Sequence, residues 1–585
     1  MDDFEIKTSK DGFTLKLWRG ERMCLLGFDV EQPEDDFVGF AVECWTPGDP
    51  DFHPLKNRLT FDPMPGAPAA GGANGTAVTG DFQFSTLEAP FQKFRWVHFP
   101  HDPKPGIYKY RATKMHMPSD GTLAKGVTLE LEIDLNPVTY DGFLDVGFTR
   151  NFASSQAFVE KFGAENLKDI GSKLIPDKAE DGLDFSKMPG DFYQWLGFEA
   201  YDLLFNLLKE AVDDPTIELD VFAYDLNEPD VVSQLEKLGS RLRVIIDDSK
   251  GHNDTTSAET VAAARLEASA GADQVKRTHF IHLQHHKVII AKRNGKAFKV
   301  LAGSTNFSFR GLYVQANNML VFDDPEVADL YEQVFELAFT TNPSKFGSSN
   351  LASVWHQVQP PRKPGIQFCF SPHGNSDLAL VPIRDAVNNA TSSVLYAIAF
   401  LNQITSGPTH DAFEGLMQKP IFSYGLVNTI GGLEVRKPDG STGLVSFHTL
   451  AAHAPEPFKS EWAGGHGINL HHKFVVTDFG LPTAKVFTGS SNFSPSGEAG
   501  NGDHLILIED RRVATSYAIE AIRVFDHYQF RSRMSEATKL NTVAGAPPDR
   551  LKLHKPRGIS GEANWFEVYY QVDSQKARDR QLFSA

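Results

Sequence analysis

The sequence predicts an α/β protein in which two similar lobes follow an all-β domain. Apolar and polar residues alternate through residues 1–145, which is typical of β-strands. Strands then alternate with helices over 190–356, and this alternation begins again over 365–535, after a proline-rich stretch. Since 585 residues are too many for one hydrophobic core, we expect roughly three or four structural units.

The first 145 residues predict an antiparallel β-sandwich. Apolar side chains occupy every second position in four stretches, and glycine, proline and aspartate separate these stretches. The segment 63–80, rich in proline, glycine and alanine, predicts a mobile loop. Because no group of residues here suggests catalysis, we expect an accessory domain that packs against the rest. The four stretches are 12–18, 38–45, 107–112 and 127–135.

In each of the two following lobes the sequence alternates between predicted strands and amphipathic helices. This pattern predicts one sheet per lobe, covered by helices. The last segment, 540–585, is rich in aromatic residues, and we expect it to pack back on the body. In the first lobe the predicted elements are helix 201–212, strand 216–224, helix 228–239 and strand 241–248; in the second they are strand 366–372, helix 379–390 and strand 393–400.

A polar motif occurs once in each lobe at a constant distance along the chain. His285 and Lys287 lie 186 residues before His471 and Lys473. The same 186 residues separate two Gly-Ser-x-Asn sequences that follow these pairs. The constant spacing indicates an internal duplication and predicts two lobes around a pseudo-two-fold axis. The Gly-Ser-x-Asn residues are Gly303, Ser304 and Asn306 in the first lobe, and Gly489, Ser490 and Asn492 in the second.

These residue types suit a phosphodiester substrate. On a strand, a spacing of two places the imidazole and the ammonium group on one face. Two Lys and two Asn side chains could bind the non-bridging oxygens, whose charge grows as phosphorus becomes five-coordinate. One imidazole could attack phosphorus, while the other protonates the departing oxygen and then activates water. Such a site requires no metal ion, because ammonium groups balance the charge.

The paired H-x-K and G-S-x-N motifs resemble those of the phospholipase D superfamily, over roughly residues 190–535. The resemblance implies metal-independent and cofactor-free hydrolysis through a phosphohistidine. It implies a phospholipid or another small phosphodiester as substrate, although the superfamily also contains phosphatidyltransferases and nucleases. Transfer to an alcohol, or transphosphatidylation, would follow because any hydroxyl group can replace water at the intermediate.

The sequence departs from the family pattern at two places. The second motif continues to an acid, Asp478, whereas Lys292 stands at the matching position of the first. This acid is usually structural in the family, so we expect the loss to be tolerated. Family members also tend to carry Asn-x-Glu after Gly-Ser-x-Asn, and the matching places here end in Asp503 and Asn317.

This asymmetry predicts different roles for the two imidazoles. We expect Asp503 to bond to His471 and Asn317 to bond to His285. A carboxylate would raise the pKa of His471 above about 6.5 and make it the general acid and base. His285, beside an uncharged amide, would stay neutral and act as the nucleophile, as the family precedent for the N-terminal His also implies. The two motif serines, Ser304 and Ser490, are expected to bind substrate.

Other interpretations of the motifs remain open. Four histidines at 279, 282, 285 and 286 could form a metal cluster, although strand alternation would divide them between two faces. A nuclease of the same superfamily is an alternative, but the net charge of −18 makes nucleic acid the less favoured substrate. An inactive scaffold that binds phosphorylated ligands is a further alternative. Retention of both His, both Lys and both Asn argues against this last one.

The composition also predicts the location and the assembly. The N-terminal residues carry no apolar signal segment, and the apolar run at 394–401 is far too short to span a membrane. Three cysteines cannot form a disulfide framework. We therefore expect a cytoplasmic protein without a transmembrane anchor, while export without a signal stays open. Because a duplicated chain completes its own site, we expect a monomer.

Overall fold

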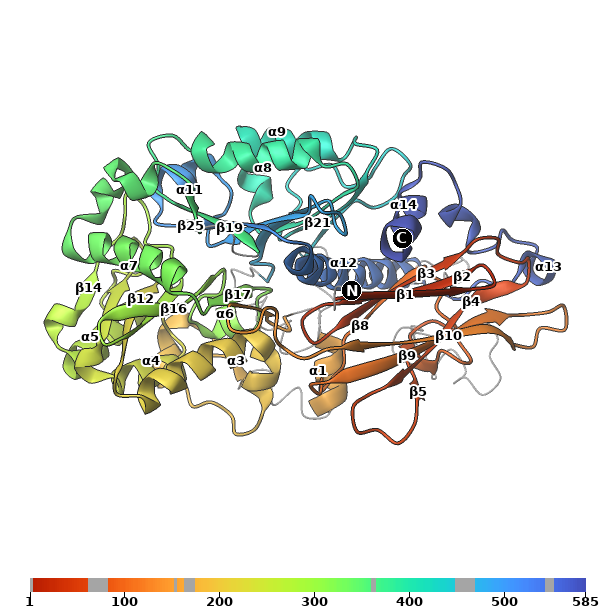
Figure 1. The fold of residues 1–585 in the computed structure, drawn as a ribbon, viewed down its shortest axis with the longest axis horizontal. Helices are drawn as coiled ribbons and strands as arrows, with labels where there is room; N and C mark the ends of the chain where they lie inside the picture. The colour runs from red at the N-terminus through yellow and green to blue at the C-terminus, as the bar shows by residue number, and fades with distance from the viewer. Residues whose placement is uncertain are drawn as a thin grey trace.

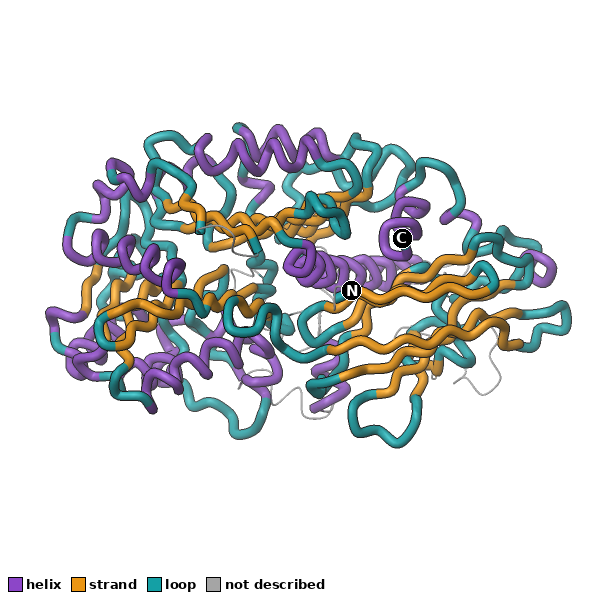
Figure 2. Tube along the Cα trace, in the orientation of Figure 1, coloured by secondary structure: helices purple, strands orange, loops and turns teal. Residues whose placement is uncertain are grey.

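The computed structural model describes residues 4–61, 83–151, 155–162, 174–358, 364–447, 469–541 and 552–585. The segment 63–80, expected to be a loop, lies outside the described residues. Two large mixed sheets and two smaller antiparallel sheets form the molecule, with helices packed around the large sheets (Figure 1, Figure 2). The prediction of a mixed α/β protein with several sheets is confirmed.

The N-terminal part contains two four-stranded antiparallel sheets, drawn in red and orange in Figure 1. Their facing sides bury the alternate apolar residues that the sequence indicated, such as Phe13, Leu15 and Leu17. A two-stranded ribbon, β6 and β7, accompanies them. One sheet has the order β1 (Glu5–Lys10), β2 (Phe13–Arg19), β3 (Cys24–Val30), β8 (Arg95–His98); the other has β10 (Ala124–Asp134), β9 (Ile107–His116), β4 (Phe37–Trp45), β5 (His53–Pro54); the ribbon is β6 (Lys56–Asn57) and β7 (Phe84–Ser85).

The first large sheet has seven strands in the order β11-β17-β16-β15-β12-β13-β14. Its edge strand β11 pairs with β17, so the domain boundary expected at residue 145 cuts through a strand of this sheet. The strands are β11 (Leu144–Phe148), β12 (Ile217–Ala223), β13 (Leu242–Ile246), β14 (Val275–Arg277), β15 (Val288–Arg293), β16 (Lys296–Gly303) and β17 (Asn318–Phe322). The helices of this part are α1 (Ser155–Phe162), α3 (Phe192–Asp213), α4 (Pro229–Glu236), α5 (Ala258–Ala270), α6 (Phe309–Tyr313) and α7 (Pro325–Thr340).

The second large sheet has eight strands in the order β18-β19-β25-β24-β23-β20-β21-β22. From β19 to β22 it repeats the first sheet strand for strand, with the same parallel and antiparallel pairings. The strands are β18 (His356–Gln357), β19 (Gly365–Phe370), β20 (Ser393–Ile398), β21 (Phe422–Val427), β22 (Leu444–Ser446), β23 (Lys473–Thr477), β24 (Lys485–Gly489) and β25 (His504–Glu509). The helices are α8 (Asp377–Asn389), α9 (Pro408–Leu416), α11 (Pro495–Gly500) and α12 (Arg511–Asn541).

The long helix α12 and the C-terminal segment join the parts of the molecule. Helix α12 runs beneath the second large sheet, between it and the N-terminal strands (Figure 1). The last helix packs on both β3 and β21, and the Trp18 indole donates a hydrogen bond to the carbonyl of Phe583 at 2.8 Å. No described helix is both long and apolar enough to cross a bilayer. The C-terminal helices are α13 (Arg557–Ser560) and α14 (Gln575–Ser584).

Candidate active site

The two His-x-Lys motifs lie at the starts of equivalent strands, and not within them as expected. The first motif ends one residue before β15, and Lys473 opens β23. The backbone N–H of His285 donates to the carbonyl of Gly502 at 2.9 Å, and that of His471 donates to the carbonyl of Ala316 at 3.0 Å. Each motif therefore pairs with a segment of the opposite lobe, which brings the two motifs together.

Each motif imidazole is hydrogen-bonded through Nδ1 to a side chain of the opposite lobe. His285 Nδ1 lies 2.7 Å from Asp503 Oδ1, and His471 Nδ1 lies 2.9 Å from Asn317 Oδ1. The expected pairing was wrong, because it joined each His to the acid or amide of its own lobe. The residues after Gly-Ser-x-Asn cross to the other lobe, so they approach the imidazole that is more distant in sequence.

The motif serines hold the two acceptors in place. Ser490 Oγ donates to Asp503 Oδ1 at 2.7 Å, and Ser304 Oγ donates to Asn317 Oδ1 at 2.9 Å. Both serines are fully buried. A hydroxyl in this position orients the acceptor that orients the ring, which favours a positioning role over the expected contact with substrate.

The two motif lysines are buried without a carboxylate at salt-bridge distance. Lys473 Nζ donates to the carbonyl of His471 at 2.9 Å, and Lys287 Nζ bonds in the same way to His285. Burial lowers the pKa of Lys287 to about 8. Burial, and next the charge of Lys287, lower the pKa of Lys473 well below its usual value. An anion bound between these ammonium groups would stabilise both charges and raise both pKa values.

The glycine of each Gly-Ser-x-Asn sequence is required by the backbone. Gly303 has φ 141° and Gly489 has φ 137°, a region that L side chains rarely adopt. A Cβ atom would lie 2.6 Å from the carbonyl of Asn318 at the first position and 2.3 Å from that of His504 at the second. Both turns thus fix the direction in which the following Ser and Asn point.

Each motif asparagine has a buried side-chain oxygen without a hydrogen-bond partner among the described residues. Asn306 Nδ2 donates to the carboxylate of Asp225, while its Oδ1 has no partner in the described part of the chain. Asn492 Oδ1 likewise lacks a partner there. Buried polar atoms without partners are costly, and at a binding site they are commonly satisfied by the ligand.

The charges around the imidazoles differ between the lobes. Burial lowers the pKa of His285, and Asp503 partly opposes this shift. Burial, and next the charge of Lys473, lower the pKa of His471 well below its usual value. Burial alone would raise the pKa of Asp503, but His285 and Lys287 hold it far below its usual range. In the free site these shifts favour the neutral form of both imidazoles and the ionised form of Asp503.

The departure of the first lobe from the family motif has a structural explanation. Asp478 Oδ1 accepts the backbone N–H groups of Thr391 and Ser392 at 2.7 and 2.9 Å, which fixes the start of β20. In the first lobe, Lys292 instead forms a 2.8 Å ion pair with the buried Asp220. Both contacts lie at the far end of the strand from the imidazoles, so neither touches the reacting groups.

The clustered histidines of the first lobe have different partners. His279 bonds to Asp248, while the ring of His286 turns into the core and lies 3.3 Å from that of His504, nitrogen to nitrogen. Two other groups of described residues bring potential metal ligands close together, Asp225, His252 and Glu259, and Asp220, Glu332 and Glu336. The first group surrounds the His252 imidazolium, and the second pairs with both Lys292 and Arg243.

The sequence interpretation missed a set of residues beside His285. The Tyr224 ring lies 4.8 Å from that of His285, and Lys287 Nζ lies 4.6 Å above the Tyr224 ring. Asp247 Oδ1 accepts the N–H of Gln284, the residue before His285, at 2.6 Å. The available signal was polar residues at the C-terminal ends of the predicted strands 216–224 and 241–248.

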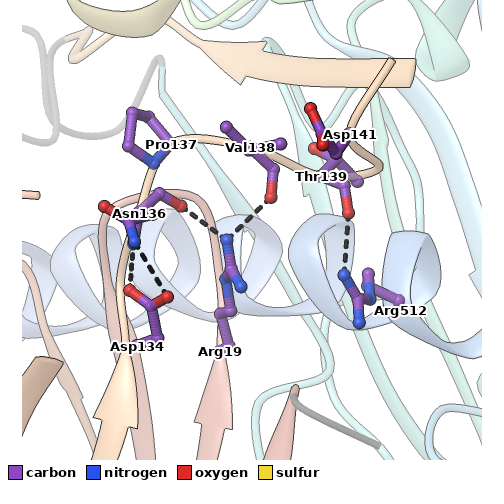
Figure 3. Close-up of a pocket in the computed structure, with 8 residues that line it drawn as sticks. All are labelled: Arg19, Asp134, Asn136, Pro137, Val138, Thr139, Asp141 and Arg512. Carbon is purple, nitrogen blue, oxygen red and sulfur yellow. Dashed lines mark hydrogen bonds between the residues drawn. The ribbon is translucent and has the colours of Figure 1, made fainter. Parts of the chain in front are cut away.

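A cavity of about 300 Å³ lies elsewhere, where the N-terminal strands meet α12. Arg19 and Arg512 donate to backbone carbonyls of the loop that lines it (Figure 3). None of the motif residues lines this cavity.

Comparison with known proteins identifies the first lobe. Residues 204–338 match the family described as "Cardiolipin synthase, PLD-like domain". This range contains His285, Lys287 and Asn306. No curated protein matches the chain.

Several solved structures are similar at low identity. Phosphatidylserine synthase of Haemophilus influenzae is 12% identical, with a TM-score of 0.39, over 59% of this chain and 93% of that one. A mutant of yeast tyrosyl-DNA phosphodiesterase is 14% identical, with a TM-score of 0.30, over 56% and 89%. Nuc from Salmonella typhimurium is 22% identical, with a TM-score of 0.18, over 22% and 83%. The resemblance to the phospholipase D superfamily that the two motifs indicated is confirmed by the family match, which assigns a PLD-like domain to residues 204–338 of this chain.

Proposed function

We propose that this protein is a metal-independent phosphodiesterase that cleaves a phospholipid or a related small phosphodiester through a phosphohistidine. The observation that supports this most directly is the crossed pair of hydrogen bonds, His285 to Asp503 and His471 to Asn317. It brings two imidazoles together from two lobes that we interpret as duplicated halves related by a pseudo-two-fold axis. Water would complete the reaction, and an alcohol could take its place.

His285 is the proposed nucleophile. Asp503 accepts its Nδ1–H, which leaves Nε2 as the ring nitrogen with a free lone pair. When Nε2 attacks phosphorus, the ring gains positive charge, and the adjacent carboxylate stabilises that charge. The nucleophile is thus the one assigned from the sequence, but for the opposite reason: the carboxylate supports the imidazole that becomes cationic through bonding to phosphorus.

His471 is the proposed general acid and base. Its Nδ1 bonds to an uncharged amide, and burial together with Lys473 lowers its pKa. Once protonated in the presence of the anionic substrate, such a ring gives up its proton readily to the departing oxygen. The neutral ring then accepts a proton from water, which attacks the phosphohistidine and releases His285.

Lys287, Lys473, Asn306 and Asn492 would bind the non-bridging oxygens. The lysines are buried without a paired carboxylate, so a phosphodiester anion would relieve the cost of burying two ammonium groups together. These donors are fixed before substrate arrives, and they need little reorganisation as charge grows in the transition state.

The test is an assay panel in the presence of a chelator. Wild type and His285→Ala are incubated with phosphatidylcholine, bis-p-nitrophenyl phosphate and plasmid DNA. We expect chelator-resistant turnover of a lipid or small diester that His285→Ala abolishes, and a phosphorylated peptide containing His285 after acid-free quenching. Turnover that vanishes with chelator, or that survives in His285→Ala, would contradict the mechanism. Cleavage of DNA in preference to the other substrates would favour the nuclease alternative.

A further inference from the structure

The two lobes differ in chemistry at one pair of equivalent positions beside the site. Asp220 of β12 lies opposite Ile290, and Leu395 of β20 lies opposite Val476, which is 186 residues after Ile290. Counting five residues on from Asp220 and Leu395 reaches Asp225 and Phe400. The first lobe therefore carries a carboxylate where the second carries an aromatic ring.

Asp225 contacts Asn306, one of the residues proposed to bind the phosphate oxygens, and its side chain is partly exposed. One of its carboxylate oxygens accepts from Asn306 Nδ2, and the other lies 3.2 Å from His252 Nε2. Its side chain is 30% exposed, whereas Asn306 is 3% exposed. Since a carboxylate offers about four lone-pair sites, Asp225 can accept a further hydrogen bond from a ligand next to the phosphate.

Carboxyl groups gather beside Asp225 around the ring of His252. His252 Nδ1 bonds to Asp247 at 2.8 Å, so its imidazole is held between two carboxylates. Burial alone would lower the pKa of His252, but the hydrogen bonds that its ring donates to Asp225 and Asp247 raise this pKa to about 10. Glu259 lies beside the same ring, and its Oε1 accepts the N–H of Leu226. One imidazolium thus faces three carboxyl groups, Asp225, Asp247 and Glu259, while the charges of Lys287 and Lys473 also act on Asp225.

The equivalent positions of the second lobe hold uncharged side chains, Phe400 and Asn428. The Phe400 ring lies 6.5 Å from that of His471. The next residue, Leu401, lines a cavity of about 230 Å³ together with Ile404 and Phe413. Asn428 stands at the position equivalent to Asp247, and its Oδ1 accepts the N–H groups that precede His471. Glu414 and Glu434 also line that cavity, so the difference in charge between the lobes is a difference at these equivalent positions.

We propose that Asp225 is a specificity-determining residue, which binds an ammonium group carried by one alcohol of the phosphodiester. This inference rests on the proposed function and names its substrate class, an ester of an amino alcohol. An ammonium group beside the phosphate would meet the Asp225 carboxylate while the phosphate oxygens meet Asn306 and the lysines. The charge pattern of the ligand would then match that of the site, cation to carboxylate and anion to donors.

Equilibrium binding tests this without requiring turnover. Calorimetry compares phosphoethanolamine with propyl phosphate, which is of similar size but lacks the ammonium group, on wild type, Asp225→Asn and Asp248→Asn. Asparagine at 225 can still accept from Asn306, so the variant removes the charge and keeps that contact. Asp248→Asn removes an equal charge from the partly exposed pair with His279, in the segment after β13.

We expect wild type and Asp248→Asn to bind phosphoethanolamine about 10- to 100-fold more tightly than propyl phosphate, the range for a charge-assisted hydrogen bond. In Asp225→Asn this ratio should fall close to one. The inference is overturned if Asp225→Asn keeps the ratio, if wild type shows no preference, or if wild type binds neither ligand.

Turnover separates this inference from the proposed function. Phosphatidylethanolamine and bis-p-nitrophenyl phosphate are compared on the same variants. A selective loss of kcat/KM for phosphatidylethanolamine in Asp225→Asn supports the inference, and an equal loss for both substrates overturns it, because Asp225 would then only position Asn306. Failure of wild type to cleave any diester would count against the proposed function, while the calorimetric ratio would still decide on Asp225.

Discussion

Replacing Asp503 with asparagine should slow the reaction without altering the size of the side chain. Asp503 is 1% exposed, and its Oδ1 accepts from both His285 Nδ1 and Ser490 Oγ. A hydrogen bond to a charged group contributes about 1.5–3 kcal/mol, which corresponds to about 10- to 160-fold in rate. We expect a loss of this size in kcat with little change in KM, because the carboxylate contacts the nucleophile and not the substrate.

The assay is the hydrolysis of bis-p-nitrophenyl phosphate, followed by identification of the phosphorylated peptide after quenching. Asn317→Asp serves as the reciprocal variant, and the double variant moves the carboxylate from His285 to His471. We expect phosphate on His285 in wild type and partly on His471 in the double variant. A kcat for Asp503→Asn equal to that of wild type would refute the reasoning, as would phosphate on His471 in wild type.

Three further predictions concern charge, backbone and pH. Lys287→Met should lower kcat by about 10²–10³-fold in the same assay, since it removes one donor to the transition state. Gly489→Ala should lower the free energy of unfolding by roughly 1–3 kcal/mol in urea because of its positive φ, whereas Gly374→Ala, which meets no atom within 4 Å, should have little effect. Burial lowers the pKa of His504 to about 3. Below about pH 6.5 this residue therefore binds a proton in the unfolded chain but not in the folded protein. Stability should therefore fall as the pH drops from about 6.5 towards 3, by at most about 1.4 kcal/mol per pH unit from this group, and His504→Asn should reduce that slope in urea titrations at several pH values.

The elements of the large sheets could be predicted because their patterns are local. The strand expected at 216–224 is β12, Ile217–Ala223, and the helix expected at 228–239 contains α4, Pro229–Glu236. Apolar runs bounded by turn residues and a proline at the first helical position are sufficient for such predictions. The membership of β11 in the first large sheet could not be predicted, since its partner β17 lies about 170 residues away and pairing over that distance leaves no local pattern.

The motif residues could be predicted from their spacing, but their partners could not. The repeated spacing predicted two imidazoles in equivalent places. The partner of each imidazole depends on whether the segment after Gly-Ser-x-Asn stays in its own lobe or reaches the opposite one. That direction is set by contacts such as the bridge between Gln284 and Gly502, which no sequence pattern marks. Asp225 was missed for a different reason: an acid after a strand is common at protein surfaces, and its meaning depends on the neighbouring Asn306.

The equivalent positions of the two lobes explain how a duplicated fold can give its two imidazoles different roles. Around His285 the structure gathers three carboxylates, Asp225, Asp247 and Asp503, the last from the opposite lobe. Around His471 the corresponding positions hold Phe400, Asn428 and Asn317. In the proposed mechanism, the first environment would stabilise a ring that becomes cationic on bonding to phosphorus. The second would disfavour a lasting charge on the ring that gives its proton away. Under this proposal, the similar backbones of the two lobes would place the two imidazoles on opposite sides of phosphorus, and the three differences between the lobes would decide which imidazole attacks. The double variant Asp503→Asn, Asn317→Asp tests whether one of these differences is sufficient to exchange the roles of His285 and His471.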